Sequence, residues 1–159
     1  MKIRSVVPVA RRRAFSIATA RGSFEFPWSE LDVVPSAADP VVEAFPDPEL
    51  GQEGFTYRLA SGAEGTVHVE HVLRFVRDPD YQRKELLYAL TSEAIDALAA
   101  AGRTKRSLAR QLGTSLAQLA RLLDSANTRK SVDQMVRLLA ALGRKVELHV
   151  GAIETAATR

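Results

Sequence analysis

The chain has 159 residues, a formal net charge of +3 and a hydrophobic fraction of 46%. A chain of this length and composition can form one large domain or two small ones, each with a buried core. It contains no cysteine, which excludes disulfides, thiolate metal sites and a cysteine nucleophile. No segment approaches the roughly 20 apolar residues of a membrane span, and the basic start lacks the apolar run of a signal peptide. We therefore expect a cytoplasmic protein with no membrane partner.

Residues 1–78 predict a small β-rich domain, because β-branched and aromatic residues alternate with polar ones between turn formers. Residues 34–51 hold several prolines and acids, which predicts an irregular segment between the third and fourth strands. The predicted strands are Lys2 to Val9, Ala14 to Ala20, Ser23 to Trp28, Gly54 to Ala60 and Thr66 to Phe75.

Residues 79–151 predict a helical domain, because the hydrophobic period there changes to about 3.6 residues. Capping residues and glycines mark the helix ends, including a capping box at Ser131 and Gln134. Lys145 to Val150 alternates like a strand, and residues 152–159 are expected to form a flexible tail. The predicted helices are Asp80 to Ala89, a second helix capped by Thr91 and running to Ala101, Lys105 to Leu112, Leu116 to Leu123 and Val132 to Leu142.

Charge is distributed unevenly between the two halves. Residues 1–80 carry nine Lys and Arg against twelve Asp and Glu, a net charge of −3, whereas residues 81–159 carry thirteen against seven, a net charge of +6. Within residues 103–130 there are seven basic residues, and Asp124 is the one acid. A surface with this imbalance predicts a polyanionic partner.

Residues 103–143 have the pattern of two helices that cross through a tight turn. The crossing needs a small residue, which Ala109 supplies, and the turn needs a residue that tolerates a positive φ, which Gly113 supplies. The stretch TKRSLARQLGTSLAQLARLLDS resembles the DNA-binding unit of lambda-type repressors and the wider XRE family. The match lies in Leu108, Ala109, Leu112, Gly113, Ser115, Leu119 and Leu122.

This resemblance implies an α+β chain, in which a small N-terminal β-rich domain precedes an all-α lambda-repressor-like helix-turn-helix domain that ends in a short strand. It also implies a sequence-specific, DNA-binding transcription regulator, with Ser115 to Leu123 as the recognition helix in the major groove. The residues expected to read bases are Arg121, Gln118, Leu116, Ala117 and Ala120. The residues expected to bind phosphates are Thr104, Lys105, Arg106, Ser115, Asn127, Thr128, Arg129, Lys130 and Ser131.

Several alternatives stay open at this point. The helices could form a plain bundle with solvated charges, or present their surface to a protein partner. The chain could also be an antitoxin-like or adaptor protein whose β domain binds another protein. For DNA binding we expect a homodimer, because two half-sites about one helical turn apart give a small module useful affinity. We expect no enzymatic activity or cofactor, because the sequence holds no phosphate loop, paired-carboxylate site or nucleophile elbow. We expect no metal, because His68 and His71 would point to opposite faces of a strand.

Overall fold

The computed structural model describes residues 1–151 and divides the chain into two compact units, Met1–Gln82 and Arg83–Arg159. The division falls within helix α2 (Pro79–Ala100), whereas the sequence placed the boundary after residue 78. The tail expected at residues 152–159 lies outside the described residues. We call the first unit the β unit and the second the helical unit.

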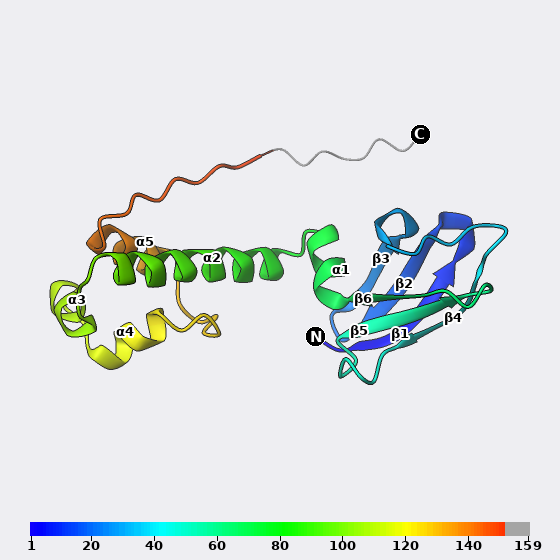
Figure 1. Cartoon of the computed structure of the whole chain (residues 1–159), viewed down its shortest axis with the longest axis horizontal. Helices are drawn as coiled ribbons and strands as arrows, with labels where there is room; N and C mark the ends of the chain where they lie inside the picture. The colour runs from blue at the N-terminus through cyan, green and yellow to red at the C-terminus, as the bar shows by residue number, and fades with distance from the viewer. Residues whose placement is uncertain (152–159) are drawn as a thin grey trace. The chain divides into compact units, whose positions relative to one another are not determined.

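The β unit contains two three-stranded antiparallel sheets (Figure 1). In the first sheet, Val6 pairs with Ile17 and Ile17 pairs with Phe24. In the second, Phe55 pairs with Val67. Short 3₁₀ helices at Ala10–Arg12 and Trp28–Glu30 follow the first and third strands. The strands are β1 (Ile3–Val9), β2 (Ala14–Thr19), β3 (Gly22–Pro27), β4 (Val41–Pro46), β5 (Gly54–Leu59) and β6 (Glu64–His68).

Aromatic rings fill the core of the β unit. The Phe15 ring lies 5.1 Å from that of Phe55 and 5.2 Å from that of Tyr57, measured between ring centroids. Helix α1 (Val69–Phe75) packs against β3 and β6, and the rings of Phe26 and Phe75 meet edge to face at 5.5 Å. Alternate strand residues therefore supply one apolar face to a shared core, as the period of two predicts.

Two predictions for the β unit are wrong. The segment expected to be irregular contains strand β4. Its prolines do not interrupt the strand, because they lie outside the paired residues or at the strand end, where the missing N–H removes no hydrogen bond between strands. The long strand expected at Thr66 to Phe75 ends early, and α1 follows. Val69, Val72 and Leu73 are buried at helical spacing, although the same stretch also alternates.

The helical unit is built from α2, α3 (Lys105–Gln111), α4 (Leu116–Leu122) and α5 (Val132–Ala141). Thr104, Ser115 and Ser131 are the N-caps of α3, α4 and α5, and each side chain accepts a hydrogen bond from a backbone N–H three residues later. The buried core contains Leu87, Leu90, Ala94, Leu98, Leu108, Ala109, Leu119, Leu122, Met135, Leu138 and Leu139.

The helical unit also departs from its prediction. Helix α2 is continuous where two helices were expected, and Thr91 is buried within it, donating to the carbonyl of Leu87 at 2.6 Å instead of capping a new helix. Residues 145–150 form no strand. The expected fold class is therefore wrong: two β sheets and a short helix are followed by four helices, and the described chain has no terminal strand.

None of the helices in the described part of the chain is both long and apolar enough to span a bilayer.

Candidate functional site

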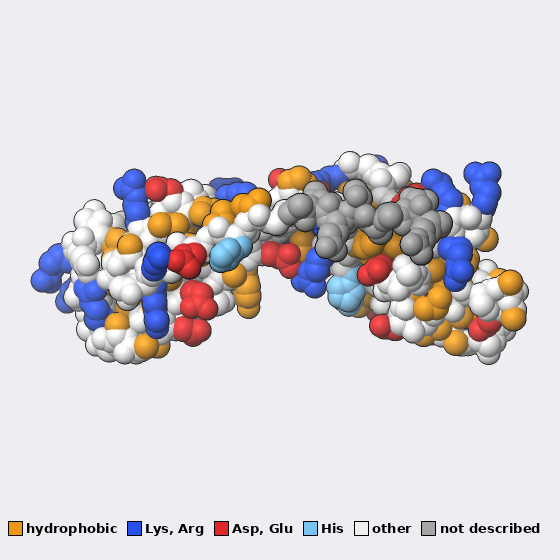
Figure 2. Space-filling model, turned by 90° about the horizontal axis from the view of Figure 1, so that it is seen from above, with side chains coloured by type: hydrophobic (Ala, Val, Ile, Leu, Met, Phe, Trp, Pro, Cys, Tyr) orange, Lys and Arg blue, Asp and Glu red, His pale blue; other side chains and the backbone are white. Residues whose placement is uncertain are grey.

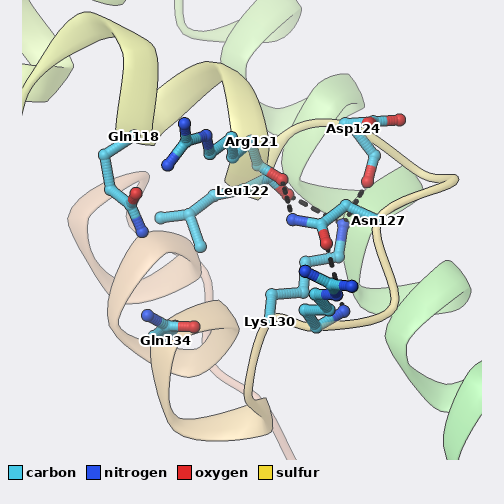
Figure 3. A pocket seen from close by; sticks show the side chains of 8 residues that line it. Gln118, Arg121, Leu122, Asp124, Asn127, Lys130 and Gln134 are labelled. Atoms are coloured by element: carbon cyan, nitrogen blue, oxygen red, sulfur yellow. Dashed lines mark hydrogen bonds between the residues drawn. The ribbon is translucent and has the colours of Figure 1, made fainter.

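A pocket of about 610 Å³ opens between α4, α5 and the loop that connects them. Figure 3 shows side chains from both helices and from the loop directed toward this space. We call it the α4–α5 pocket. Its lining residues are Gln118, Arg121, Leu122, Asp124, Asn127, Arg129, Lys130 and Gln134.

Local sequence positions α4 at the pocket. Gly113 adopts a φ of +64°, which lets the chain turn after α3, and the Ser115 hydroxyl accepts from the Gln118 backbone N–H at 3.1 Å. Leu119 and Leu122 are buried in the core. Gln118 and Arg121, three residues apart, lie on the neighbouring face of the helix and line the pocket.

The loop is held by side-chain hydrogen bonds to its backbone. The Asn127 amide nitrogen donates to the carbonyl of Arg121 at 2.9 Å, and its oxygen accepts from the Arg129 N–H at 3.1 Å. From α2, Arg83 donates to the carbonyls of Thr128 at 2.9 Å and Lys130 at 3.0 Å. The loop therefore presents a fixed wall, since both of its ends are anchored.

Lys130 is buried, with 3% of its surface exposed. Its ammonium donates to the carbonyls of Leu122 at 2.9 Å and Asp124 at 2.6 Å, where α4 ends. Carbonyls at a helix C-terminus lack intrahelical donors and favour a cation. Burial lowers the pKa of Lys130 below its usual value, and the nearby charge of Asp124 acts in the opposite direction.

Helix α5 contributes Gln134 through a capping box. The Ser131 hydroxyl accepts from the Gln134 backbone N–H at 3.1 Å, and the Gln134 side-chain oxygen accepts from the Ser131 N–H at 2.9 Å. This bond fixes the orientation of the amide and leaves its NH₂ group available. In Figure 3, Gln118 and Gln134 lie on one side of the pocket, and Asn127 and Lys130 lie on the other.

The pocket is electropositive. Three cationic side chains line it, those of Arg121, Arg129 and Lys130, against the single carboxylate of Asp124. Arg121 and Arg129 are exposed, and neither guanidinium forms a salt bridge with any residue in the range 1–151. Figure 2 shows further Lys and Arg side chains projecting from the part of the helical unit where α3 lies. Together these groups can attract and hold an anion.

The pocket brings together five of the residues that the sequence singled out: Gln118, Arg121, Asn127, Arg129 and Lys130. Because Lys130 is buried in the wall of the pocket, its charge acts only on a ligand that is inside the pocket. Leu116, Ala117 and Ala120 are exposed on α4 but do not line the pocket.

The remaining predicted residues lie elsewhere. Thr104, Ser115 and Ser131 act as helix caps, and Thr128 serves the loop through its carbonyl. Lys105 and Arg106 are exposed on α3. Lys105 lines a second pocket of about 430 Å³, whose other lining residues are Ile95, Leu98, Ala99, Gly102, Arg103 and Leu123.

Sequence reasoning missed two contributors. Arg83 lies 45 residues before its partner Thr128, and no local pattern signals that contact. Gln134 was identified for its capping box, which does not by itself indicate a pocket. Within residues 1–151, no group of three or more His, Asp or Glu side chains is arranged to hold a metal ion.

Comparison with known families corrects the predicted resemblance. Residues 88–157 match the family model of the FIMAH domain, which is less than half of the chain, and no curated protein or solved structure matches. The expectation of an XRE-type, DNA-binding transcription regulator is therefore wrong. The small and aliphatic residues around the turn between α3 and α4 suggested that family. They satisfy packing requirements that any tightly connected helix pair shares, so they do not specify a nucleic-acid partner. Over residues 88–157 the chain is similar to the FIMAH domain.

Proposed function

We propose that this chain is a binding protein without catalytic activity, and that its α4–α5 pocket takes a small ligand carrying phosphate or carboxylate groups. The observation that carries the proposal is the pair of exposed guanidinium groups, Arg121 and Arg129, that share one pocket with the buried ammonium of Lys130. Guanidinium groups match the geometry of carboxylates and phosphates through paired N–H donors.

The buried cation supports binding of an anion. An ammonium has three N–H donors, and Lys130 uses two of them on the carbonyls of Leu122 and Asp124. The position of the Lys130 charge is thus fixed. Among the residues that line the pocket, the exposed carboxylate of Asp124 is the one negative charge that compensates it. An anion in the pocket would compensate this charge in surroundings less polar than water, where the attraction is stronger.

Two amide groups add directional donors. The NH₂ of Gln134 stays available because its capping bond uses the side-chain oxygen. The Gln118 side chain makes no hydrogen bond with another residue in the described part of the chain. A volume of about 610 Å³ falls within the roughly 300–1,000 Å³ that is usual for small-molecule sites.

A titration monitored by NMR tests this proposal on the full chain. Citrate and phosphoserine serve as the carboxylate and phosphate probes, and side-chain signals of Arg121, Gln118 and Gln134 report on the pocket. We expect one or both probes to shift these signals at saturable concentrations. Saturable shifts at Lys105 and Arg106 in place of the pocket signals, or no saturation with either probe, would overturn the assignment.

A partner protein for the β unit remains a separate proposal. It is favoured by the exposed apolar side chains of Val7 and Val42, which lie on strands β1 and β4, two strands that contact each other. A photo-crosslinking residue at position 42 of the full chain should give a crosslinked product of one defined mass with such a partner. Loss of that product in a Val7→Asp variant would support the proposal, and a product that persists unchanged would count against it.

A further inference from the structure

Residues 145–150 leave helix α5 as extended chain (Figure 1), although their sequence alternates as a strand would. No backbone hydrogen bond links them to another residue of the described range. The apolar side chains of Leu148 and Val150 are 71% and 87% exposed. A segment of strand-forming residues whose backbone donors and acceptors have no partner within residues 1–151 is a template for pairing with another chain.

The segment has two chemically distinct faces. Val146, Leu148 and Val150 fall on one face of an extended chain, and Lys145, Glu147 and His149 fall on the other. Val146 already packs against the buried core of the helical unit. Lys145 and Glu147 form an ion pair on the polar face. The apolar face is thus anchored at Val146 and uncovered beyond it.

We propose that residues 145–151 pair antiparallel with the same residues of a second copy of this chain. The two-fold axis passes through Leu148, so that Val146 lies opposite Val150 and Glu147 lies opposite His149. Such an interface is isologous, and both copies bury the same surface.

Two features select this register: Leu148 is the centre of the extended residues 145–151, and the polar side chains complement one another across the strands. A register centred on Val146 would pair Lys145 with Glu147, but it would need residues 142–144 in the strand, where α5 ends at the cap Leu142 and Gly143 has a φ of +73°.

An imidazole N–H of His149 can donate to the Glu147 carboxylate across the strands, and this happens twice because of the symmetry. If the axis moved by one residue to Glu147, the two carboxylates would lie opposite each other and Lys145 would lie opposite His149. Like charges that face each other directly are destabilising.

The anchored residue explains how so short a ribbon can persist. A two-stranded ribbon alone is only marginally stable in water. In this register, however, each Val150 lies beside the partner's Val146, which packs on the helical core. Val150 has the highest exposed fraction among the large apolar side chains of residues 1–151, and in this register it is covered next to the buried core of the other copy.

Charge reversal on the full chain tests the pairing by sedimentation. We expect a dimer for the natural chain, a dimer dissociation constant at least tenfold higher for Glu147→Lys, and recovery of the dimer in Glu147→Lys/His149→Glu. Lys145→Gln is the matched control, because it removes the Lys145–Glu147 ion pair within one copy and should leave the dimer intact. A natural chain that stays monomeric, or a double variant as weak as Glu147→Lys, would overturn the proposal.

Disulfide trapping tests the register separately, because the chain has no cysteine of its own. Opposed residues in antiparallel strands have Cα atoms about 4.5–5.5 Å apart, which suits a disulfide. A mixture of Glu147→Cys and His149→Cys chains should form a mixed disulfide faster than either variant alone forms its own. Equal or faster linkage in the single-variant samples would contradict this register.

Discussion

The guanidinium of Arg83 donates to the carbonyl of Lys130 at 3.0 Å, across 47 residues of sequence. The same side chain also donates to the carbonyl of Thr128, so one residue of α2 fixes the second half of the loop that borders the α4–α5 pocket. The shape of the pocket therefore depends on a tertiary contact as well as on the local caps of α4 and α5.

Replacement of Arg83 by Gln should loosen this loop. Two hydrogen bonds from a charged donor are lost, at a combined cost of about 1–2 kcal/mol because both lie near solvent. Hydrogen–deuterium exchange should show faster exchange in residues 124–130, and denaturant titration should show the lower free energy of unfolding. Arg137→Gln is the control, since its exposed ion pair with Asp133 contributes only a few tenths of a kcal/mol. Equal exchange rates in the two variants would contradict a role for Arg83 in the loop.

The lowered pKa of Lys130 should make the free energy of unfolding depend on pH, and the direction of the shift sets the sign of this dependence. Between the folded-state pKa and the unfolded value of 10.5, the unfolded chain binds more protons at this residue than the folded chain. The contribution of Lys130 to the free energy of unfolding therefore rises with pH through that window. Lys130→Met lacks this contribution and leaves the carbonyls of Leu122 and Asp124 without their donor, which should cost about 1–3 kcal/mol at pH 7.

Chemical denaturation of both chains between pH 7 and pH 10.5 measures the effect. The difference in free energy of unfolding, natural chain minus Lys130→Met, should increase as the pH rises. A difference that shrinks with pH would mean that the charged form of Lys130 is favoured in the folded state.

Much of the helical unit was predictable because local signals agree there. Thr104, Ser115 and Ser131 mark three helix starts, and Gly113 marks a turn, so α3, α4 and α5 lie within one or two residues of their predicted bounds. Strands β1, β2, β3 and β5 likewise follow their alternating patterns. Thr91 misled because a threonine that can cap a helix can also bond the carbonyl four residues back within one.

The candidate site was only partly predictable. Its residue types were recognisable, because Arg121, Arg129 and Gln118 belong to a basic stretch with an excess of donors. Their arrangement as a pocket was not, since it depends on Arg83 and on burial of Lys130, which arise from tertiary packing. The predicted partner was wrong because the pattern of small and aliphatic residues at a helix corner reports packing and does not report function.

Asp78 predicts acid sensitivity of the β unit. Burial raises its pKa, but the Tyr81 N–H at 2.9 Å and the Arg21 guanidinium at 2.6 Å outweigh burial and hold the pKa below 3.8. The stabilisation is therefore fully present well above pH 3.8, begins to fall as the unfolded carboxyl is protonated near pH 3.8, and is lost as the pH falls through the lower, folded-state pKa. Asp78→Asn should lower the free energy of unfolding by roughly 2 kcal/mol at pH 7. The loss is no larger because Arg21 is partly exposed, so solvent screens its attraction to the Asp78 carboxylate. Asp80→Asn is the control, since Asp80 is exposed, and a similar loss in both variants would contradict this account.

Substitution of Gly65, which pairs with Tyr57 between strands β5 and β6, should create a packing defect. A Cβ at this position would overlap the ring and hydroxyl of Tyr57, which donates to the carbonyl of Val33 at 2.7 Å. Gly65→Ala should displace the ring and cost about 1–3 kcal/mol. In a double-mutant cycle with Tyr57→Leu, the cost of Gly65→Ala should fall well below its value in the natural chain. Additive costs would show that the ring does not limit this position.

The most direct test of the proposed anion site is isothermal titration calorimetry of the full chain with whichever of citrate or phosphoserine binds more tightly. Arg121→Gln/Arg129→Gln removes both exposed cations of the pocket, and Arg106→Gln/Arg137→Gln removes two exposed cations outside it. We predict at least tenfold weaker binding for the first pair, about 1.4 kcal/mol, and a change of less than threefold for the second. Equal losses in the two pairs would show that the ligand responds to net charge alone, and would contradict a built site between α4 and α5.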